Sequence, residues 1–405
     1  MAQTTAPVNA TPQLTLQGIV VPKSAINPAA FQAATRRQNL KVKALSSIAG
    51  FGYTDNIPML QTGIISAINV RVTGTITVTL GGGTCATTYR WPYGLIKALR
   101  FSANGQSNLI NCDGWFLRAW ALANRSNRDD RGIPQGIGGA SPGTATYQGT
   151  MSMASENWGL GQGVTAIVGA PTVYTVDLDF FVPVAYDQTS LLGAVFAQTT
   201  SSALSVSIDW ESSANLFVLT GAATAVPALS AYVEATVYTI PAVGGGIVVP
   251  NLNTFHSLVQ NRISPTVSNG LNEVTWAGQG VGRQTMRSTF RITNNAGASG
   301  TFVPLAQNVT NFGEIYWRYG GNTTPEDFQD GKRLALWNEE LYNTYLGLQG
   351  FGYFDYSSLW APRDSIDEGS VTALRTGFTI QNGVTLTNAY GEYCLEELVA
   401  GGQAA

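Results

Sequence analysis

The sequence predicts an all-β protein with a few helices, built as two consecutive halves of jelly-roll type. Apolar and polar residues alternate with period 2 in short stretches such as 173–182, as in strands with one buried face. Long connections rich in Gly, Ser and Thr separate these stretches, which suits a jelly roll better than a parallel α/β sheet. The same order of strands, inserted helix and long loops recurs after the break at 241–246.

Composition favours a protein whose surface is covered by other protein. Charged residues make up only 12% of the 405 residues, and Gly alone accounts for 45. A surface so poor in charge is weakly solvated in a free monomer, but it is suitable when neighbouring copies cover it. The net charge of −3 gives no general attraction to nucleic acid or to acidic partners.

The cysteines predict free thiols. Cys85, Cys112 and Cys394 are too few and too scattered for a disulfide framework or a metal site, so we expect three buried, reduced side chains. No apolar run has the length of a membrane span, and the first residues do not resemble a signal peptide. We therefore expect a soluble chain made in a reducing compartment.

Composition and pattern divide the chain into three parts. Residues 1–54 are expected to form an arm and a basic helix, residues 55–243 the first β half, and residues 244–405 the second. The second half contains an inserted helix at about 325–346, because Thr324 and Pro325 followed by acidic residues are typical of a helix start.

The N-terminal part contains a one-sided group of basic residues. We expect a helix from Asn27 to about Leu45, since Asn27 can cap it and Pro28 suits its first turn. No acidic residue precedes Asp55. The basic residues are Lys23, Arg36, Arg37, Lys41 and Lys43. This pattern favours contact with an anionic surface, either lipid headgroups or nucleic acid, and the alternative is a solvated helix that merely lacks acids.

The first half contains the clearest local patterns. We expect a long strand through Ile68–Val78, a hairpin turn at Asn104–Gly105, and a short helix over 113–124. The stretch Val173–Trp210, with two alternating strands around a short apolar connector, is expected to form the core of this half.

Residues for catalysis are hard to find. His256 is the single histidine and has no acid and nucleophile near it in the sequence, so a structural role is favoured over a Ser-His-Asp arrangement. Asp177 and Asp179 share one strand face about 7 Å apart by the strand rise, yet they alternate with core residues, so solvent or a neighbouring subunit is favoured over glycosidase chemistry. We predict no catalytic, cofactor-binding or metal-binding residues and no enzyme activity.

Several segments occur in an order that is informative: Asn27–Arg36, Gly63–Val72, Leu95–Gly105, Asp113–Leu117, Phe181–Ala197, Thr236–Pro250 and Leu252–Leu258. Their order resembles the major capsid protein of tectiviruses, the membrane-containing phages whose shell protein shares the double jelly roll of adenovirus hexon. They span most of the first half, whereas the second half is similar in organisation only.

The resemblance implies two consecutive eight-stranded jelly rolls and a structural role in an icosahedral shell. Such a chain would form pseudo-hexameric trimers that contact neighbouring trimers, penton and minor capsid proteins. Its N-terminal helix would face an inner membrane, with no sequence-specific nucleic acid contact and no cofactor. The expected location is the virion capsid, assembled in the host cytoplasm.

Two other functions remain open from the residues alone. One is a carbohydrate-binding or glycan-hydrolysing β-sandwich protein, which would need a clustered Trp and Asp site. The other is a receptor-binding spike, which would favour fibrous repeats.

Overall fold

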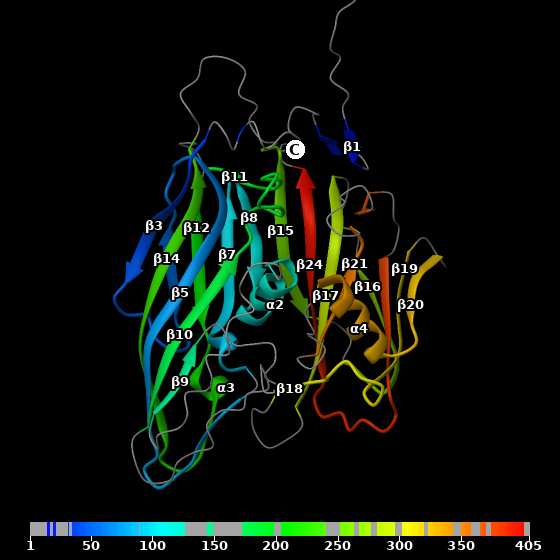
Figure 1. The fold of residues 1–405 in the computed structure, drawn as a ribbon. Helices are drawn as coiled ribbons and strands as arrows, with labels where there is room; N and C mark the ends of the chain where they lie inside the picture. Colours follow the sequence, from blue (N-terminus) through cyan, green and yellow to red (C-terminus); the bar gives the residue numbers. More distant parts are fainter. Residues whose placement is uncertain are drawn as a thin grey trace, which may run out of the picture.

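In the computed structural model two β-barrels stand side by side, and their strands run along a common long axis (Figure 1). The structure describes residues 14–16, 19–21, 31, 35–88, 90–125, 144–148, 172–197, 204–239, 252–262, 267–276, 282–295, 302–319, 323–342, 350–357, 365–369 and 374–400. The double jelly roll predicted from the sequence is confirmed.

The first barrel has a six-stranded sheet on its outer side. The order is β3-β14-β5-β10-β9, and β11 also pairs with β5. The strands are β3 (Arg37–Leu45), β14 (Thr224–Tyr238), β5 (Ile64–Thr79), β10 (Thr172–Val182), β9 (Thr144–Gln148) and β11 (Val195–Phe196). Only β9 pairs in parallel; all the other pairs of this sheet are antiparallel.

A ten-stranded sheet runs through both barrels. Its order is β18-β17-β24-β15-β8-β7-β12-β4, and β21 and β22 pair with β17 outside this path. The strands are β18 (Phe302–Pro304), β17 (Arg283–Asn295), β24 (Tyr390–Ala400), β15 (Thr254–Arg262), β8 (Gln106–Cys112), β7 (Ile96–Ala103), β12 (Ser205–Trp210), β4 (Thr54–Pro58), β21 (Phe351–Asp355) and β22 (Ile366–Asp367). The parallel pair β15–β8 joins the two barrels.

A four-stranded antiparallel sheet completes the second barrel, and small elements close the ends. The order is β16-β23-β19-β20. The strands are β16 (Gly270–Trp276), β23 (Leu374–Ile380), β19 (Phe312–Tyr319) and β20 (Thr323–Phe328); the short pairs are β1 (Leu14–Leu16) with β2 (Ile19–Val21) and β6 (Cys85–Thr87) with β13 (Phe217–Leu219). The helices are α2 (Gly114–Arg125), α3 (Ser213–Leu216) and α4 (Gly331–Tyr342), with a 3₁₀ turn η2 (Tyr93–Leu95).

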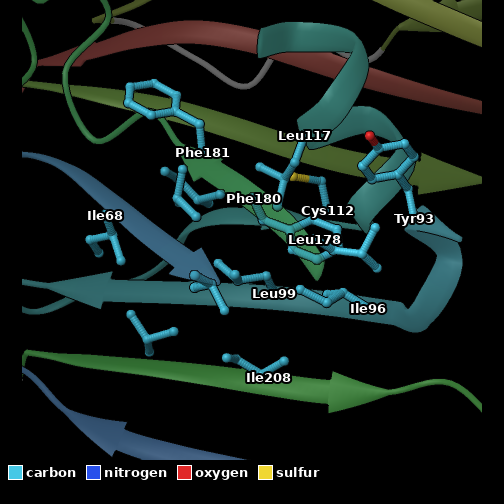
Figure 2. Close-up of a cluster of buried hydrophobic side chains, with 14 of the residues drawn as sticks. Ile68, Tyr93, Ile96, Leu99, Cys112, Leu117, Leu178, Phe180, Phe181 and Ile208 are labelled. Atoms are coloured by element: carbon cyan, nitrogen blue, oxygen red, sulfur yellow. The ribbon is translucent and has the colours of Figure 1, made fainter. Parts of the chain in front are cut away.

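The core of the first barrel lies between its two sheets and is closed by α2 (Figure 2). Leu178 and Phe180 of β10 point inward, as their alternation with Asp177 and Asp179 predicted. Tyr93 makes edge contacts with Trp115, at 5.1 Å between ring centroids, and with Phe180, at 5.9 Å. The strand, hairpin and helix predictions for this half are confirmed: Asn104 and Gly105 turn between β7 and β8 with positive φ, as a two-residue hairpin requires.

The predicted N-terminal helix to Leu45 is wrong over residues 37–45, which form the edge strand β3 paired with β14. Leu40 and Val42 are half-buried against the barrel core, whereas Arg37, Lys41 and Lys43 are exposed. Residues 37–45 gain more from burying one apolar face against the sheet than from continuing the helix that the Ala-rich sequence before residue 37 predicts. Asn27 and Pro28, which were expected to begin that helix, lie outside the described residues.

The inserted helix of the second half, predicted at about 325–346, begins later than predicted. Residues 323–328 form β20, which lies at the edge of its sheet. Proline has no N–H to donate to a neighbouring strand, and an edge strand tolerates Pro325 because it has a neighbour on one side only. Helix α4 begins after Asp330, whose Oδ1 accepts a hydrogen bond from the Arg333 N–H at 2.8 Å. The helix is described as far as Tyr342, and the predicted residues 343–346 lie outside the described residues. The predicted boundary between residues 243 and 244 lies outside the described residues and stays a prediction.

Candidate assembly surface and inter-barrel junction

The single histidine lies between the barrels. His256 of β15 is buried; its Nδ1 lies 2.7 Å from the Pro183 carbonyl oxygen and its Nε2 lies 3.0 Å from Glu396 Oε1. The ring therefore bridges the loop before β11 and strand β24 through both of its nitrogens. Gly193, with φ of +86°, packs so closely that an added Cβ would lie 2.8 Å from His256 Cβ. The expected structural role of this residue is confirmed.

Glu396 is the centre of this junction. Its carboxylate accepts hydrogen bonds from Arg287 Nε at 2.9 Å, from Trp120 Nε1 at 2.7 Å and from His256. Burial by itself would raise the pKa of Glu396, but the Arg287 charge and the bonds from His256 and Trp120 outweigh it and lower the pKa to about 2. Arg287 also donates to Asn124 Oδ1 at 2.8 Å, so α2 of the first barrel is tied to β17 and β24 of the second.

A second polar group links the start of α2 to the second barrel. Asp113 caps α2 by accepting the Phe116 N–H at 2.8 Å, and its own N–H donates to Gln260 Oε1 at 2.7 Å. Arg291 donates to Glu392 at 3.0 Å and lies 3.5 Å from Asp113 Oδ2. Burial raises the pKa of Asp113, and the Arg291 charge opposes that rise.

The outer face of the six-stranded sheet carries mixed charge. Asp177 accepts two hydrogen bonds from Arg71, at 2.9 and 2.8 Å, and both side chains are exposed in part. Asp179 is exposed. The expectation that these two acids face outward is confirmed, and an arginine bound to one of them argues against a catalytic carboxylate pair.

The basic residues predicted from the sequence lie at the edge of this face. Arg37, Lys41 and Lys43 are exposed along β3, with Arg36 just before it, while Lys23 lies outside the described residues. Lys41 has Glu234 as its register partner on β14 and lies over the Tyr232 ring at 5.5 Å. Positive charge along an edge strand also opposes strand-to-strand association of two sheets.

The described residues bear on an enzyme or glycan-binding site in three ways. Within the described ranges no three His, Cys, Asp or Glu residues gather as a metal site would require, and no helix could cross a membrane. Cys85, Cys112 and Cys394 are buried free thiols, as expected. Among exposed large apolar side chains of the described part, Tyr53 is the one aromatic residue.

The sequence did not reveal the inter-barrel junction. Its partners are far apart in the chain: Arg287 and Glu396 are 109 residues apart, and Trp120 and Glu396 are 276 apart. One signal was available, since adjacent acids at 396 and 397 interrupt the apolar run 393–400 and one of them must face inward.

Comparison with known proteins agrees with this architecture. Residues 52–243 match the family described as "P3 major capsid protein N-terminal". This match covers the first barrel apart from β3, and slightly under half of the chain. No curated protein matches the sequence.

Several solved structures share the fold of the whole chain. The major capsid protein of the Sulfolobus turreted icosahedral virus superposes with a TM-score of 0.61 at 13% identity, covering 90% of this chain and 97% of that one. VP54 of PBCV-1 gives 0.53 at 11% identity, covering 92% and 97%. The major capsid protein of Faustovirus gives 0.53 at 9% identity, covering 91% of each chain.

The first barrel matches a major capsid protein family, and both barrels adopt the double jelly roll. The chain therefore has the double jelly-roll fold of these capsid proteins, and its first barrel is similar to a major capsid protein family.

Proposed function

We propose that this chain builds the icosahedral shell of a membrane-containing bacteriophage as pseudo-hexameric trimers. The observation that supports this most is the match of residues 52–243 to the P3 major capsid protein family, on a chain whose second barrel repeats the architecture of the first. Three copies would place six similar barrels around one axis, and closed symmetry of this kind is usual for protein assemblies.

The two barrels of one copy are suited to act as one rigid unit. The ten-stranded sheet is continuous through both of them, and the buried Glu396 network crosses between them. In a shell built of such units, neighbouring trimers, penton proteins and minor capsid proteins would be the partners, and assembly would take place in the host cytoplasm.

The oligomeric state tests the trimer directly. Size-exclusion chromatography with light scattering should give a mass three times the 42.9 kDa of one chain. Electron microscopy of the same preparation should show particles with a pseudo-hexagonal outline. A monomer that does not associate at any concentration would contradict the proposal.

The basic residues Lys23, Arg36, Arg37, Lys41 and Lys43 are proposed to face the inner membrane. On β3 three of these cations are exposed and only Lys41 has an acidic register partner. Net positive charge of this kind is attracted to anionic headgroups. Each Lys or Arg near the membrane surface contributes about 1 kcal/mol to the free energy of binding.

Vesicle binding tests the basic edge. Neutralising Arg37, Lys41 and Lys43 to Gln should weaken binding to vesicles containing anionic lipid by up to about 100-fold at low salt, because three such contributions are lost. Neutralising the exposed Lys97, Lys332 and Arg333 is the matched control and should leave binding almost unchanged. Equal loss in both variants would contradict the proposal, and binding to duplex DNA but not to vesicles would assign the edge to the genome.

A further inference from the structure

A polar groove crosses the seam between the two barrels on the sheet face opposite Glu396. Its volume is about 290 Å³, and it is lined by residues of β8, β15 and β24, with Arg283 of β17 at one side. Strand β8 belongs to the first barrel and the other three strands belong to the second. A molecule held in the groove would therefore contact both barrels.

The strand registers place the lining side chains in two rows across the groove. Val259 of β15 is the register partner of Asn111 on β8 and of Leu395 on β24. Ser257, two residues earlier on β15, faces the same side and is the register partner of Glu397. One row thus offers apolar carbon surface beside an amide, and the other offers a hydroxyl and a carboxyl group.

Glu397 is a buried acid that lacks a donor for one of its oxygens. Its side chain is 3% exposed, and its Oε2 accepts a hydrogen bond from Arg283 Nη1 at 2.7 Å. No N–H or O–H group of the described residues donates to its Oε1. A buried carboxylate oxygen without a donor is costly, so a group that brings donors into the groove would be bound favourably there.

The other lining groups indicate what kind of donor fits. The Ser257 hydroxyl and the Asn111 side-chain amide each offer an oxygen that can accept a hydrogen bond. An alkylammonium group has three N–H donors and no acceptor, so it can bond to Glu397 Oε1 and to such oxygens at once. Its methylene groups can pack against Val259 and Leu395, as the stem of a lysine side chain packs on apolar surface.

The charges favour a monovalent cation over a neutral group or a metal ion. Burial and the neighbouring Glu368 raise the pKa of Glu397 against the opposing charge of Arg283, so one guanidinium does not offset them. A divalent metal ion fits less well, because Glu397 is the one carboxylate among the described residues that line the groove and Arg283 lies beside it.

We propose that this groove is a binding site for a small linear alkylammonium ligand, with the ammonium group on Glu397 Oε1 and the carbon chain over Val259 and Leu395. The ligand contacts β8 on one side and β15 and β24 on the other, so it holds the two barrels together at their seam. The site is separate from the Glu396 network, which lies on the other face of β24 and has its own donors.

Calorimetric titration of the full-length protein with butane-1,4-diamine tests the proposal. The titration is made at about pH 8.5, above the pKa of about 8 of Glu397 and below that of an alkylammonium group, which is about 10.4 in lysine. We expect saturable binding of one diamine to each chain. Butane-1,4-diol, which has the same carbon chain and no charge, should bind at least about tenfold more weakly.

Two variants locate the ligand in the groove. Glu397→Gln keeps the size of the side chain but removes its charge, and it should weaken binding about 10- to 100-fold, as expected for the loss of a hydrogen bond between charged groups. Val259→Trp fills the groove without changing a charged residue and should abolish binding. The matched control is Glu273→Gln, an acid bound to Arg318 and Arg375 on another sheet, which should bind the diamine as the wild type does.

Thermal unfolding of the wild type gives a second readout that needs no variant. A ligand that binds the folded protein stabilises it, so saturating diamine should raise the unfolding temperature and the diol should not. Three results would overturn the proposal: no binding of the diamine by the wild type, equal binding of diamine and diol, or equal binding of the diamine by Glu397→Gln and the wild type.

Discussion

Glu396 is an ionised carboxyl group enclosed between two barrels. It persists as a charge because Arg287, Trp120 and His256 all donate to it, and the same donors lower its pKa to about 2. Burial and the neighbouring Glu368 raise the pKa of the adjacent Glu397 to about 8, against the opposing charge of Arg283. Two adjacent residues of one strand therefore have pKa values shifted in opposite directions, because the two faces of the sheet give them different partners.

Replacing Glu396 by Gln should destabilise the protein by about 3 kcal/mol or more at pH 7, because Arg287 would remain buried without its counter-charge. Since the pKa of Glu396 is lowered from 4.5 to about 2 in the folded state, its contribution is complete above pH 4.5 and is lost as the pH falls toward 2. Urea denaturation gives the free energy of unfolding of each protein. The difference between wild type and Glu396→Gln should shrink as the pH falls from 4.5 toward 2.

The exposed Glu314 on β19 is the control for this change, and Glu314→Gln should alter the stability by less than about 0.5 kcal/mol. A Glu396→Gln protein as stable as the wild type at pH 7 would show that the network contributes no net stability.

At the scale of elements, the pattern of β3 shows where the sequence was ambiguous. Leu40 and Val42 alternate with Lys41 and Lys43, which fits an edge strand, but the Ala-rich residues before them favoured a helix. The pairing with β14, which lies some 190 residues away in the chain, decided the outcome. Helix α2 was predictable because both its cap, Asp113, and its apolar face are local.

The start of α4 can be tested in the same terms. Asp330→Ala removes the acceptor of the Arg333 N–H and should cost about 1 kcal/mol in the free energy of unfolding. Asp327→Ala, three residues earlier, changes an exposed residue of β20 and should cost much less. Chemical denaturation of the two variants tests where the helix starts. If it started at Thr324, Asp327→Ala would cost more free energy of unfolding than Asp330→Ala.

At the scale of the whole molecule, the two barrels share more than a boundary. Tyr342, Phe351, Tyr353 and Cys394 of the second half belong to the apolar core of the first barrel. The parallel pair β15–β8 makes one sheet of two. From the sequence two separate halves were predicted, and their common core could not be seen because its contacts join residues from opposite ends of the chain.

This shared core predicts that both barrels unfold together. Calorimetry of the dissociated chain should show a single transition whose calorimetric and van't Hoff enthalpies agree, as in two-state unfolding. Peptides from β10 in the first barrel and from β23 in the second should lose exchange protection at the same temperature. Trp120→Phe, which removes one donor to Glu396, should lower that temperature for both peptides equally. If only the β10 peptide responded, or if two transitions appeared, the barrels would be independent folding units and the buried network would join them only after each had formed.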